Sequence, residues 1–253
     1  MPAKKSNVIQ EPSIRERAYL FVRRKIASGE LPPGAILSEA SIAREFGNRR
    51  GPLREAIRQL TAEGFLRQNP NRSCVVTEFS RRDIAELYEL REALEVYAAG
   101  QAATHGLQRP DLDTLQRLID EVLVLRDKLQ ASGERLLNAI QMRRFVQIDF
   151  NFHDVLVRAA ANRRIQKVFT DTRVLLSVFA MRRNVHTVEL LTEIHRYHSA
   201  VVSAIAAGEP ATAMRHLTEH IRVSKQERLK EYDERDRQIA MYHPLLDLSE
   251  SLE

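Results

Sequence analysis

The sequence ILSEASIAREFGNRRGPLREAI, residues 36–57, decides the architecture of this chain. It predicts two short helices joined by a tight turn at residues 46–48, with the second helix opening on Pro52. Arg49, Arg50 and Arg54 lie at or near the start of that second helix. The start of a helix carries partial positive charge, so arginines there do not stabilise the helix by themselves. Their positions indicate a negatively charged partner, and nucleic acid is the best candidate.

The flanking residues complete a winged helix-turn-helix. Residues 13–28 carry apolar side chains at three- and four-residue steps, which predicts a preceding helix. Residues 65–76 predict a β-hairpin with a turn at residues 69–71 and with Arg72 near its tip. Such a fold places one helix in the major groove of DNA and the hairpin near a phosphate or the minor groove. We expect this DNA-binding domain to span residues 13–78.

Charge is concentrated in the same part of the chain. The first 80 residues contain 14 of the 39 Lys and Arg residues and 8 of the 34 Asp and Glu residues, a net charge of +6. The other 173 residues contain 25 basic and 26 acidic residues, a net charge of −1. The first 80 residues thus form a basic head, and the remaining residues form a nearly neutral body. This distribution indicates that the head binds a polyanion and that the body has another role. Residues 1–12 are expected to be a mobile arm, with contact of Lys4 and Lys5 to the DNA backbone as the alternative.

The body is expected to be entirely helical. No alternating run typical of a strand follows Val76. Apolar residues recur instead at helical spacing in six segments: 83–105, 111–137, 142–161, 164–184, 187–207 and 210–237. The predicted fold class is mainly α, with an N-terminal winged helix-turn-helix, a small β-hairpin wing and a C-terminal antiparallel helical bundle. The bundle spans residues 83–237, between a linker at 79–82 and an unassigned tail at 238–253.

Composition excludes several classes of protein. No run of about 18 apolar residues exists, so we expect no membrane-spanning helix and no membrane partner. The N-terminus lacks the apolar core of a secretory signal. The single cysteine, Cys74, rules out an internal disulfide. These features predict a cytoplasmic protein.

Histidines in the body are the candidate chemical groups. His153 follows Asp149 by four residues, so both side chains lie on one face of a helix. His198 and His220 lie on two later helices. One Asp and three His that converge inside a bundle can bind a divalent cation such as Zn²⁺ and leave positions open for water or a ligand.

Spacing alone does not choose among the histidines. His216 and His220 are four residues apart, and His195 and His198 are three apart, so other sets compete with the first one. Histidines that lie in the core or on the surface without a metal are the further alternative.

The head resembles the winged helix-turn-helix of GntR-family bacterial transcription regulators. Residues 29–39 match the family pattern G-x-L-x-P-G-x-x-L-S-E, and residues 60–65 match L-x-x-E-G-L with Phe65 in the last place. Residues 49–57, RRGPLREAI, align with S-R-T-P-V-R-E-A-L. The resemblance implies that Arg50 and Arg54 read guanine edges in a double-stranded DNA operator. A solvated charge or a phosphate clamp is the alternative for each arginine.

The other residues that the resemblance assigns to DNA binding are Ser38, Arg49, Gly51, Asn71 and Arg72. Two departures from the family pattern bear on base specificity. Arg49 and Gly51 replace the Ser and Thr that usually flank the first arginine. Ser73 replaces the usual wing glycine, and Asn71 is expected to supply the unusual backbone angle.

The body resembles the ligand-binding domain of the FadR-like branch of this family, an FCD-type domain. Residues 149–162 match D-x-x-F-H…N, and residues 198–220 match H-x-x-[IV]-x-x-A-I-x-x-G-[DE]-x-x-x-A-x-x-x-x-x-x-H. The resemblance implies a divalent metal ion, Zn²⁺ with Ni²⁺ or Mn²⁺ as alternatives. Its ligands would be Asp149, His153, His198 and His220, which leaves His195 and His216 as surface residues.

Residues 90–95 match a further pattern of this branch, L-R-E-x-L-E. The resemblance implies that Arg91 binds the carboxylate of an effector, because a guanidinium pairs with a carboxylate through two parallel hydrogen bonds. An internal salt bridge to Glu92 or Glu95 is the alternative.

The resemblance covers residues 13–230. It implies a homodimeric transcription regulator, a repressor, that binds a near-palindromic operator and is controlled by a small carboxylate or sugar-acid effector at the metal. One alternative is an architectural DNA binder whose helical body only dimerises. Another is a metal-dependent enzyme with an accessory DNA-binding domain, although no H-E-x-x-H or other catalytic motif is visible.

Overall fold

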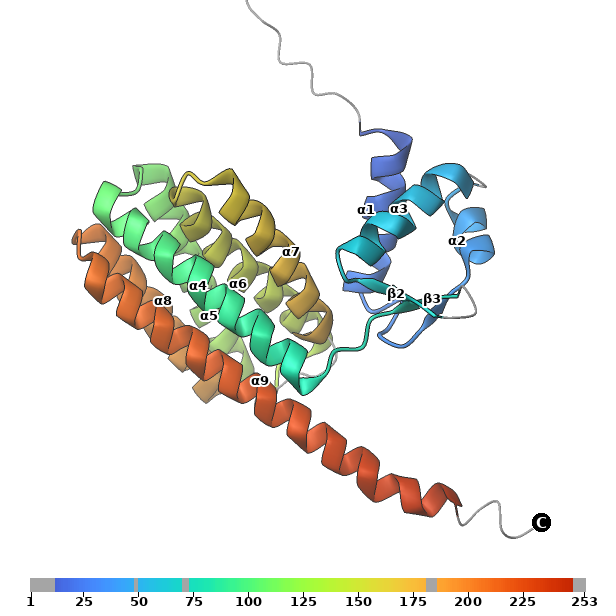
Figure 1. Ribbon diagram of the computed structural model, residues 1–253. Helices are drawn as coiled ribbons and strands as arrows, with labels where there is room; N and C mark the ends of the chain where they lie inside the picture. The colour runs from blue at the N-terminus through green and yellow to red at the C-terminus, as the bar shows by residue number, and fades with distance from the viewer. Residues whose placement is uncertain (1–11, 48–49, 70–72, 181–185, 248–253) are drawn as a thin grey trace, which may run out of the picture. The chain divides into compact units, whose positions relative to one another are not determined.

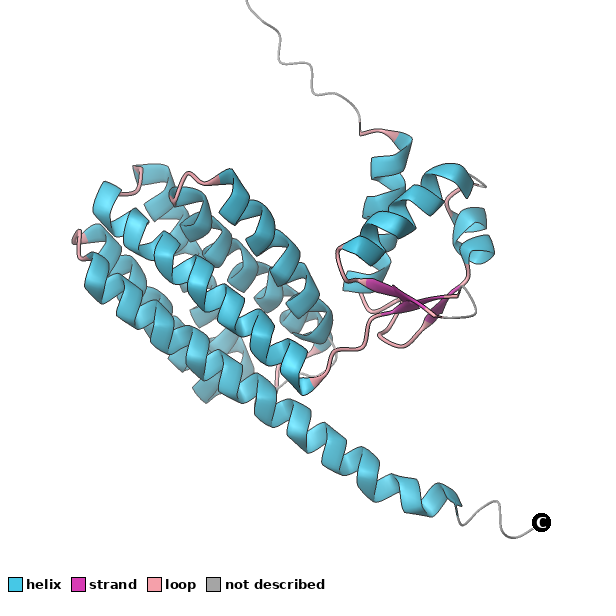
Figure 2. Cartoon of the chain, in the orientation of Figure 1, coloured by secondary structure: helices cyan, strands magenta, loops and turns pink. Residues whose placement is uncertain are grey.

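The computed structural model describes residues 12–47, 50–69, 73–180 and 186–247 (Figure 1). The chain divides into two compact units, Met1–Glu78 and Phe79–Glu253. Nine α-helices and one small three-stranded sheet are found in the described ranges, and Figure 2 shows that all the strands belong to the first unit. The predicted fold class is confirmed: a winged helix-turn-helix precedes an all-helical bundle.

Three helices build the first unit. α1 (Ile14–Ala27) begins at Ser13, whose Oγ accepts a hydrogen bond from the Glu16 backbone N–H at 3.1 Å. α2 (Glu39–Glu45) and α3 (Arg50–Ala62) form the helix-turn-helix. α1 packs against α3, and their facing apolar side chains are fully excluded from water. These core residues are Val22, Ile26, Leu53 and Leu60.

The sheet has the antiparallel order β1 (Ile36–Leu37), β3 (Cys74–Val76), β2 (Leu66–Gln68). The predicted hairpin is therefore confirmed as β2 and β3. β1 was not predicted, because a two-residue run has no periodicity of its own. Its pairing with β3, which sets Ile36 opposite Val75, makes it a strand.

The second unit is a bundle of six helices that lie side by side (Figure 1). Its core is almost wholly aliphatic and aromatic, with Phe152, Leu115 and Leu156 fully buried. The helices are α4 (Arg81–His105), α5 (Arg109–Ser132), α6 (Ala139–Ala159), α7 (Arg163–Ala180), α8 (Val188–Ala206) and α9 (Pro210–Asp247).

Local chemistry shifts several of the predicted helix ends. Ser80 caps α4 in a capping box with Asp83, and the helix begins at Arg81, two residues before the start of the predicted segment at residue 83. Gly133, with φ of 69°, ends α5 five residues before the predicted end. Asn138 caps α6 three residues earlier than expected.

The helix predicted to end at residue 237 was placed too short, since α9 continues to Asp247. Extending an existing helix needs no new nucleus, so it can run through a stretch that lacks clear apolar periodicity. None of the helices in the described ranges is both long enough and apolar enough to cross a membrane.

Candidate metal centre and nucleic-acid interface

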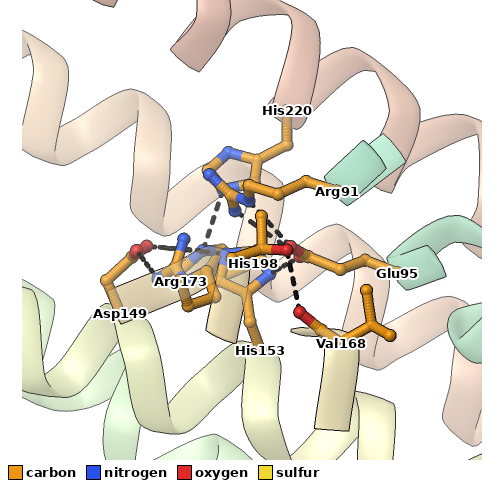
Figure 3. Close-up of polar contacts among 9 residues, drawn as sticks. Arg91, Glu95, Asp149, His153, Val168, Arg173, His198 and His220 are labelled. Carbon is orange, nitrogen blue, oxygen red and sulfur yellow. Dashed lines mark hydrogen bonds and ion pairs between the residues drawn. The ribbon is translucent and has the colours of Figure 1, made fainter. Parts of the chain in front are cut away.

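Four side chains with metal-binding atoms converge inside the bundle (Figure 3). Asp149 and His153 lie on α6, His198 lies on α8 and His220 lies on α9. One ligand atom from each residue lies within 4.8 Å of the others, and all three imidazoles are buried. This is the set that the family resemblance selected.

The distances within the cluster suit one small cation. Nε2 of His198 lies 3.2 Å from Nε2 of His220, and Oδ1 of Asp149 lies 3.5 Å from Nε2 of His153 and 3.8 Å from Nε2 of His198. Zinc–nitrogen bonds of about 2.0–2.1 Å separate tetrahedral ligands by roughly 3.3 Å. Three imidazole nitrogens and one carboxylate oxygen are also a donor set that Zn²⁺ and Ni²⁺ accept.

Glu95, on α4, orients one of these ligands. Its Oε2 lies 2.5 Å from Nδ1 of His153, and both side chains are fully buried. A carboxylate at Nδ1 holds the proton there and leaves the lone pair of Nε2 facing the other ligands. Sequence reasoning named Glu95 only as a salt-bridge partner of Arg91. Its position four residues after Arg91 was the signal that the sequence offered.

The protonation states favour cation binding. Burial, reinforced by the neighbouring imidazoles, holds the pKa of His198 well below its ordinary value and lowers that of His220 to about 3. Burial alone would raise the pKa of Asp149, but Arg173 and His153 outweigh it and hold that pKa well below its usual range. At neutral pH these groups therefore offer lone pairs free of protons, as metal ligands must.

A cavity of about 90 Å³ opens beside the cluster. Asp149 and His220 form part of its wall, and three arginines, Arg91, Arg173 and Arg228, also line it. Buried apolar side chains such as Phe145 and Leu176 also line it. Because one water needs roughly 10–15 Å³ by this measure, the cavity has room for a small organic molecule.

Arg91 forms an ion pair within α4 and also lines the cavity. Its Nε donates a hydrogen bond to Oε1 of Glu95 at 2.7 Å, which is the salt-bridge alternative. The same side chain lines the cavity beside His220. Burial alone would lower the pKa of Arg91, but Glu95 raises it above its ordinary value, so the guanidinium stays charged.

The competing histidines lie outside the cluster. His195 is half-buried, with Nε2 3.5 Å from the Ser199 hydroxyl, and His216 has Nδ1 3.8 Å from Glu219. Neither contributes to the group of four that the structure brings together.

On the first unit, three of the predicted DNA-binding residues, Arg50, Gly51 and Arg54, lie in the first two turns of α3. Arg50 and Gly51 are exposed on its first turn, which contains no acidic residue. Ser38 caps α2, with its Oγ accepting a hydrogen bond from the Ser41 backbone N–H at 3.3 Å. Three further predicted residues, Arg49, Asn71 and Arg72, lie outside the described residues.

Arg54 is held on the exposed face of α3 by a residue of α2. Its Nε lies 3.1 Å from Oε2 of Glu39, while 63% of its side chain remains exposed. The pairing fixes the direction of the guanidinium and leaves most of its N–H donors free to meet an acceptor. Leu53, Ile57 and Leu60 on the opposite face are buried, so the arginines cannot turn inward.

Comparison with known proteins identifies both units. Residues 14–76 match the family described as "Bacterial regulatory proteins, gntR family", and residues 86–223 match the FCD domain. The chain is 29% identical over 202 residues to the probable D-xylose utilization operon transcriptional repressor of Paenarthrobacter nicotinovorans, covering 79% of this chain and 82% of that protein. It is 28% identical over 213 residues to the gluconate operon transcriptional repressor of Bacillus subtilis (strain 168), covering 83% of this chain and 82% of that protein.

Solved structures share the fold. E. coli McbR/YncC superposes with a TM-score of 0.71 at 19% identity, over 87% of this chain and 99% of that chain. A putative GntR regulator from Rhodococcus sp. RHA1 gives a TM-score of 0.66 at 21% identity, over 85% and 97%. The matched gntR family and the two relatives named above are transcription regulators, so the enzyme alternative is set aside. The chain belongs to the GntR family of transcription regulators, with a winged helix-turn-helix followed by an FCD domain.

Proposed function

We propose that this protein is a homodimeric repressor that binds a near-palindromic DNA operator and responds to a small carboxylate at a divalent metal ion in the FCD domain. The convergence of Asp149, His153, His198 and His220 beside an arginine-lined cavity carries this proposal. Two relatives that are named as operon repressors support the assignment as a repressor instead of an activator.

Charge balance supports an anionic effector. The cavity and the residues paired to it hold three arginines against four carboxylates: Asp149, Glu95, Glu227 and Glu231. A divalent cation changes this balance from −1 to +1. A monoanion would then neutralise the site, with one carboxylate oxygen on the metal and guanidinium groups as hydrogen-bond donors. The metal would supply Lewis-acid binding of that carboxylate when present.

Helix α4 provides a physical link between the cavity and the DNA-binding unit. It carries Arg91 and Glu95 at the site, and it begins at Arg81, three residues after Glu78 ends the first unit. An effector that draws Arg91 toward its carboxylate pulls on α4, the helix that carries Arg91, and so favours a different position of that helix in the bundle. Such a change alters the spacing of two heads on an operator, to which half-site binding is sensitive.

A DNA-binding titration at fixed salt tests the proposal. We expect the purified protein to retard DNA from upstream of its own gene, and candidate small acids to release it only when metal is present. Elemental analysis and mass spectrometry of the protein as purified would identify the metal and any bound acid. No retardation in any combination of metal and acid would contradict the proposal.

A matched pair of variants separates the metal from the fold. His153→Ala with His220→Ala should still bind DNA but lose both metal and response. His195→Ala, on the same helix as His198, should keep all three properties. Equal metal content in both variants would show that the cluster is not the metal site.

A further inference from the structure

An open groove of about 770 Å³ runs along the outer face of α4 and α9. Its floor is an apolar strip on which two large side chains remain exposed, Tyr97 at 46% and Met214 at 39%. Gly100 supports this strip, because a Cβ there would lie 2.8 Å from Sδ of Met214. Apolar side chains that line a groove in this way are typical of a surface that meets a partner.

The charges beside the strip are separated by helix. α4 contributes Glu89 and Glu92, and α9 contributes Arg222 and Lys225. Within the chain, Nη2 of Arg222 lies 2.7 Å from Oε1 of Glu92, and Nζ of Lys225 lies 2.8 Å from Oε1 of Glu89. The acidic side chains of α4 therefore lie level with the basic side chains of α9 along the shared direction of these two antiparallel helices. The Arg222 and Glu89 side chains are still mostly exposed and can meet further partners.

We propose that this groove is the docking surface for a second copy of the chain, related by a two-fold axis parallel to α4 and α9. The inference rests on the homodimer of the proposed function and assigns its interface. A two-fold interface must be complementary to itself, and this face is so in charge.

The direction of the axis follows from the charges. A two-fold axis parallel to the helices exchanges the two sides of the face but keeps every residue at its height. It therefore lays α4 of one copy on α9 of the other, with Glu92 opposite Arg222 of the second copy and Glu89 opposite Lys225 of the second copy. An axis perpendicular to the helices within the face would instead set α4 on α4, with acid against acid.

The same axis satisfies the requirement of a palindromic operator. It leaves the N-termini of both α4 helices at one end of the dimer. Each DNA-binding unit is covalently attached there, because the first unit ends at Glu78 and α4 begins at Arg81. Two heads that leave from one end can reach two half-sites on the same DNA. The charges and the operator thus favour one arrangement.

Sedimentation of the full chain over a range of concentrations tests the surface. We expect Tyr97→Glu to weaken dimerisation by about tenfold or more, because it buries a charge in the apolar strip. Val124→Glu is the matched control, since Val124 is equally exposed on α5 and does not line the groove. Thermal unfolding of each variant checks that the fold is retained.

A mixing experiment tests the charge pairing. An acidic variant carries Arg222→Glu and Lys225→Glu, and a basic variant carries Glu89→Lys and Glu92→Lys. Each alone places like charges together and should be monomeric at concentrations where the wild type is dimeric. Mixed in equal amounts, they should form a heterodimer, because every α4 then faces an α9 of opposite charge.

The outcomes separate this inference from the proposed function. A dimeric wild type with an equally dimeric Tyr97→Glu variant would overturn the assigned surface and leave the homodimer intact. A wild type that is monomeric at all concentrations, alone and on operator DNA, would overturn both. If the charge variants fail to fold, the comparison of Tyr97→Glu with Val124→Glu still tests whether the groove is the dimer interface.

Discussion

Oε2 of Glu95 lies 2.5 Å from Nδ1 of His153, while Oε1 of the same carboxylate accepts a hydrogen bond from Nε of Arg91. One buried carboxylate thus touches both a candidate metal ligand and a side chain that lines the cavity. Burial alone would raise the pKa of Glu95, but Arg91 and His153 outweigh it and hold that pKa well below its ordinary value. The group is ionised at neutral pH and can hold the Nδ1 proton of His153.

Glu95→Gln should therefore weaken metal binding by about 10–100-fold. A glutamine amide can donate to Nδ1 of His153, which moves the ring proton to Nε2, where it blocks the metal. Competition against a chromogenic chelator measures the affinity. Glu86→Gln on the exposed surface of the same helix is the control. Unchanged affinity in Glu95→Gln would show that this carboxylate does not set the tautomer.

Arg54→Ala should lower operator affinity by about 1–3 kcal/mol and reduce discrimination at one base pair. The reason is that its guanidinium lies exposed at the start of α3, with only Glu39 as a charged partner among the described residues. Fluorescence anisotropy with operator and point-mutated DNA at fixed salt measures both effects. Arg58→Ala, one turn further along α3 and paired with Glu55, is the control.

A different outcome for Arg54→Ala would assign another role to this residue. A loss of affinity that is equal on every DNA sequence, with a salt dependence reduced by about one phosphate, would make Arg54 a backbone contact.

Acid should destabilise the metal-free protein partly through His186, which lines the cavity. Burial, helped by the charge of Arg228, lowers the pKa of His186 to about 3. The unfolded chain takes up this proton near pH 6.5 and the folded chain only near pH 3. Between these values the unfolded state holds more protons, so the free energy of unfolding falls as pH falls. This contribution is fully present above pH 6.5.

His186→Gln should therefore flatten the dependence of unfolding free energy on pH between about 6.5 and 3. Urea titrations at several pH values, with a chelator present, measure it. His198 and His220 act in the same direction, so part of the slope will remain. His105→Gln, at an exposed helix end, is the control substitution. An identical slope in His186→Gln and wild type would contradict the assignment.

The sequence predicted the parts of the structure that local rules control. The 3.6-residue spacing of Leu115, Leu118 and Val122 suffices for a helix, and the hairpin followed from a turn between two apolar runs. β1 could not be predicted, because Ile36 is a strand residue only through its pairing with Val75. The end of α9 was missed because helix propagation does not require an apolar stripe.

The candidate site shows the same limit. Spacing placed Asp149 and His153 on one face of α6, but the approach of α8 and α9 depends on the packing of the whole bundle. Only the family resemblance selected His198 and His220 over their neighbours. The contact of Glu95 with His153 joins residues 58 positions apart on different helices, a distance at which periodicity carries no information.

The turn between α6 and α7 offers a test of backbone strain. Ala161 has φ of 51°, the left-handed region that L-residues other than glycine adopt at a cost of roughly 1–2 kcal/mol. Asn162 follows and caps α7, with Oδ1 accepting hydrogen bonds from the backbone N–H of Arg164 and Ile165. The cap fixes where α7 begins, so the strain at Ala161 is the cost of a tight connection.

Ala161→Gly should therefore stabilise the protein by about 0.5–1 kcal/mol, since relief of strain exceeds the greater flexibility of glycine in the unfolded chain. Ala160→Gly is the matched control: Ala160 has φ of −67°, so glycine there gains nothing and should destabilise by about 0.5–1 kcal/mol. Urea unfolding of both variants gives the comparison. If the two substitutions destabilise equally, the left-handed conformation of Ala161 carries no strain, because only a strained residue reverses the sign expected of an alanine-to-glycine change.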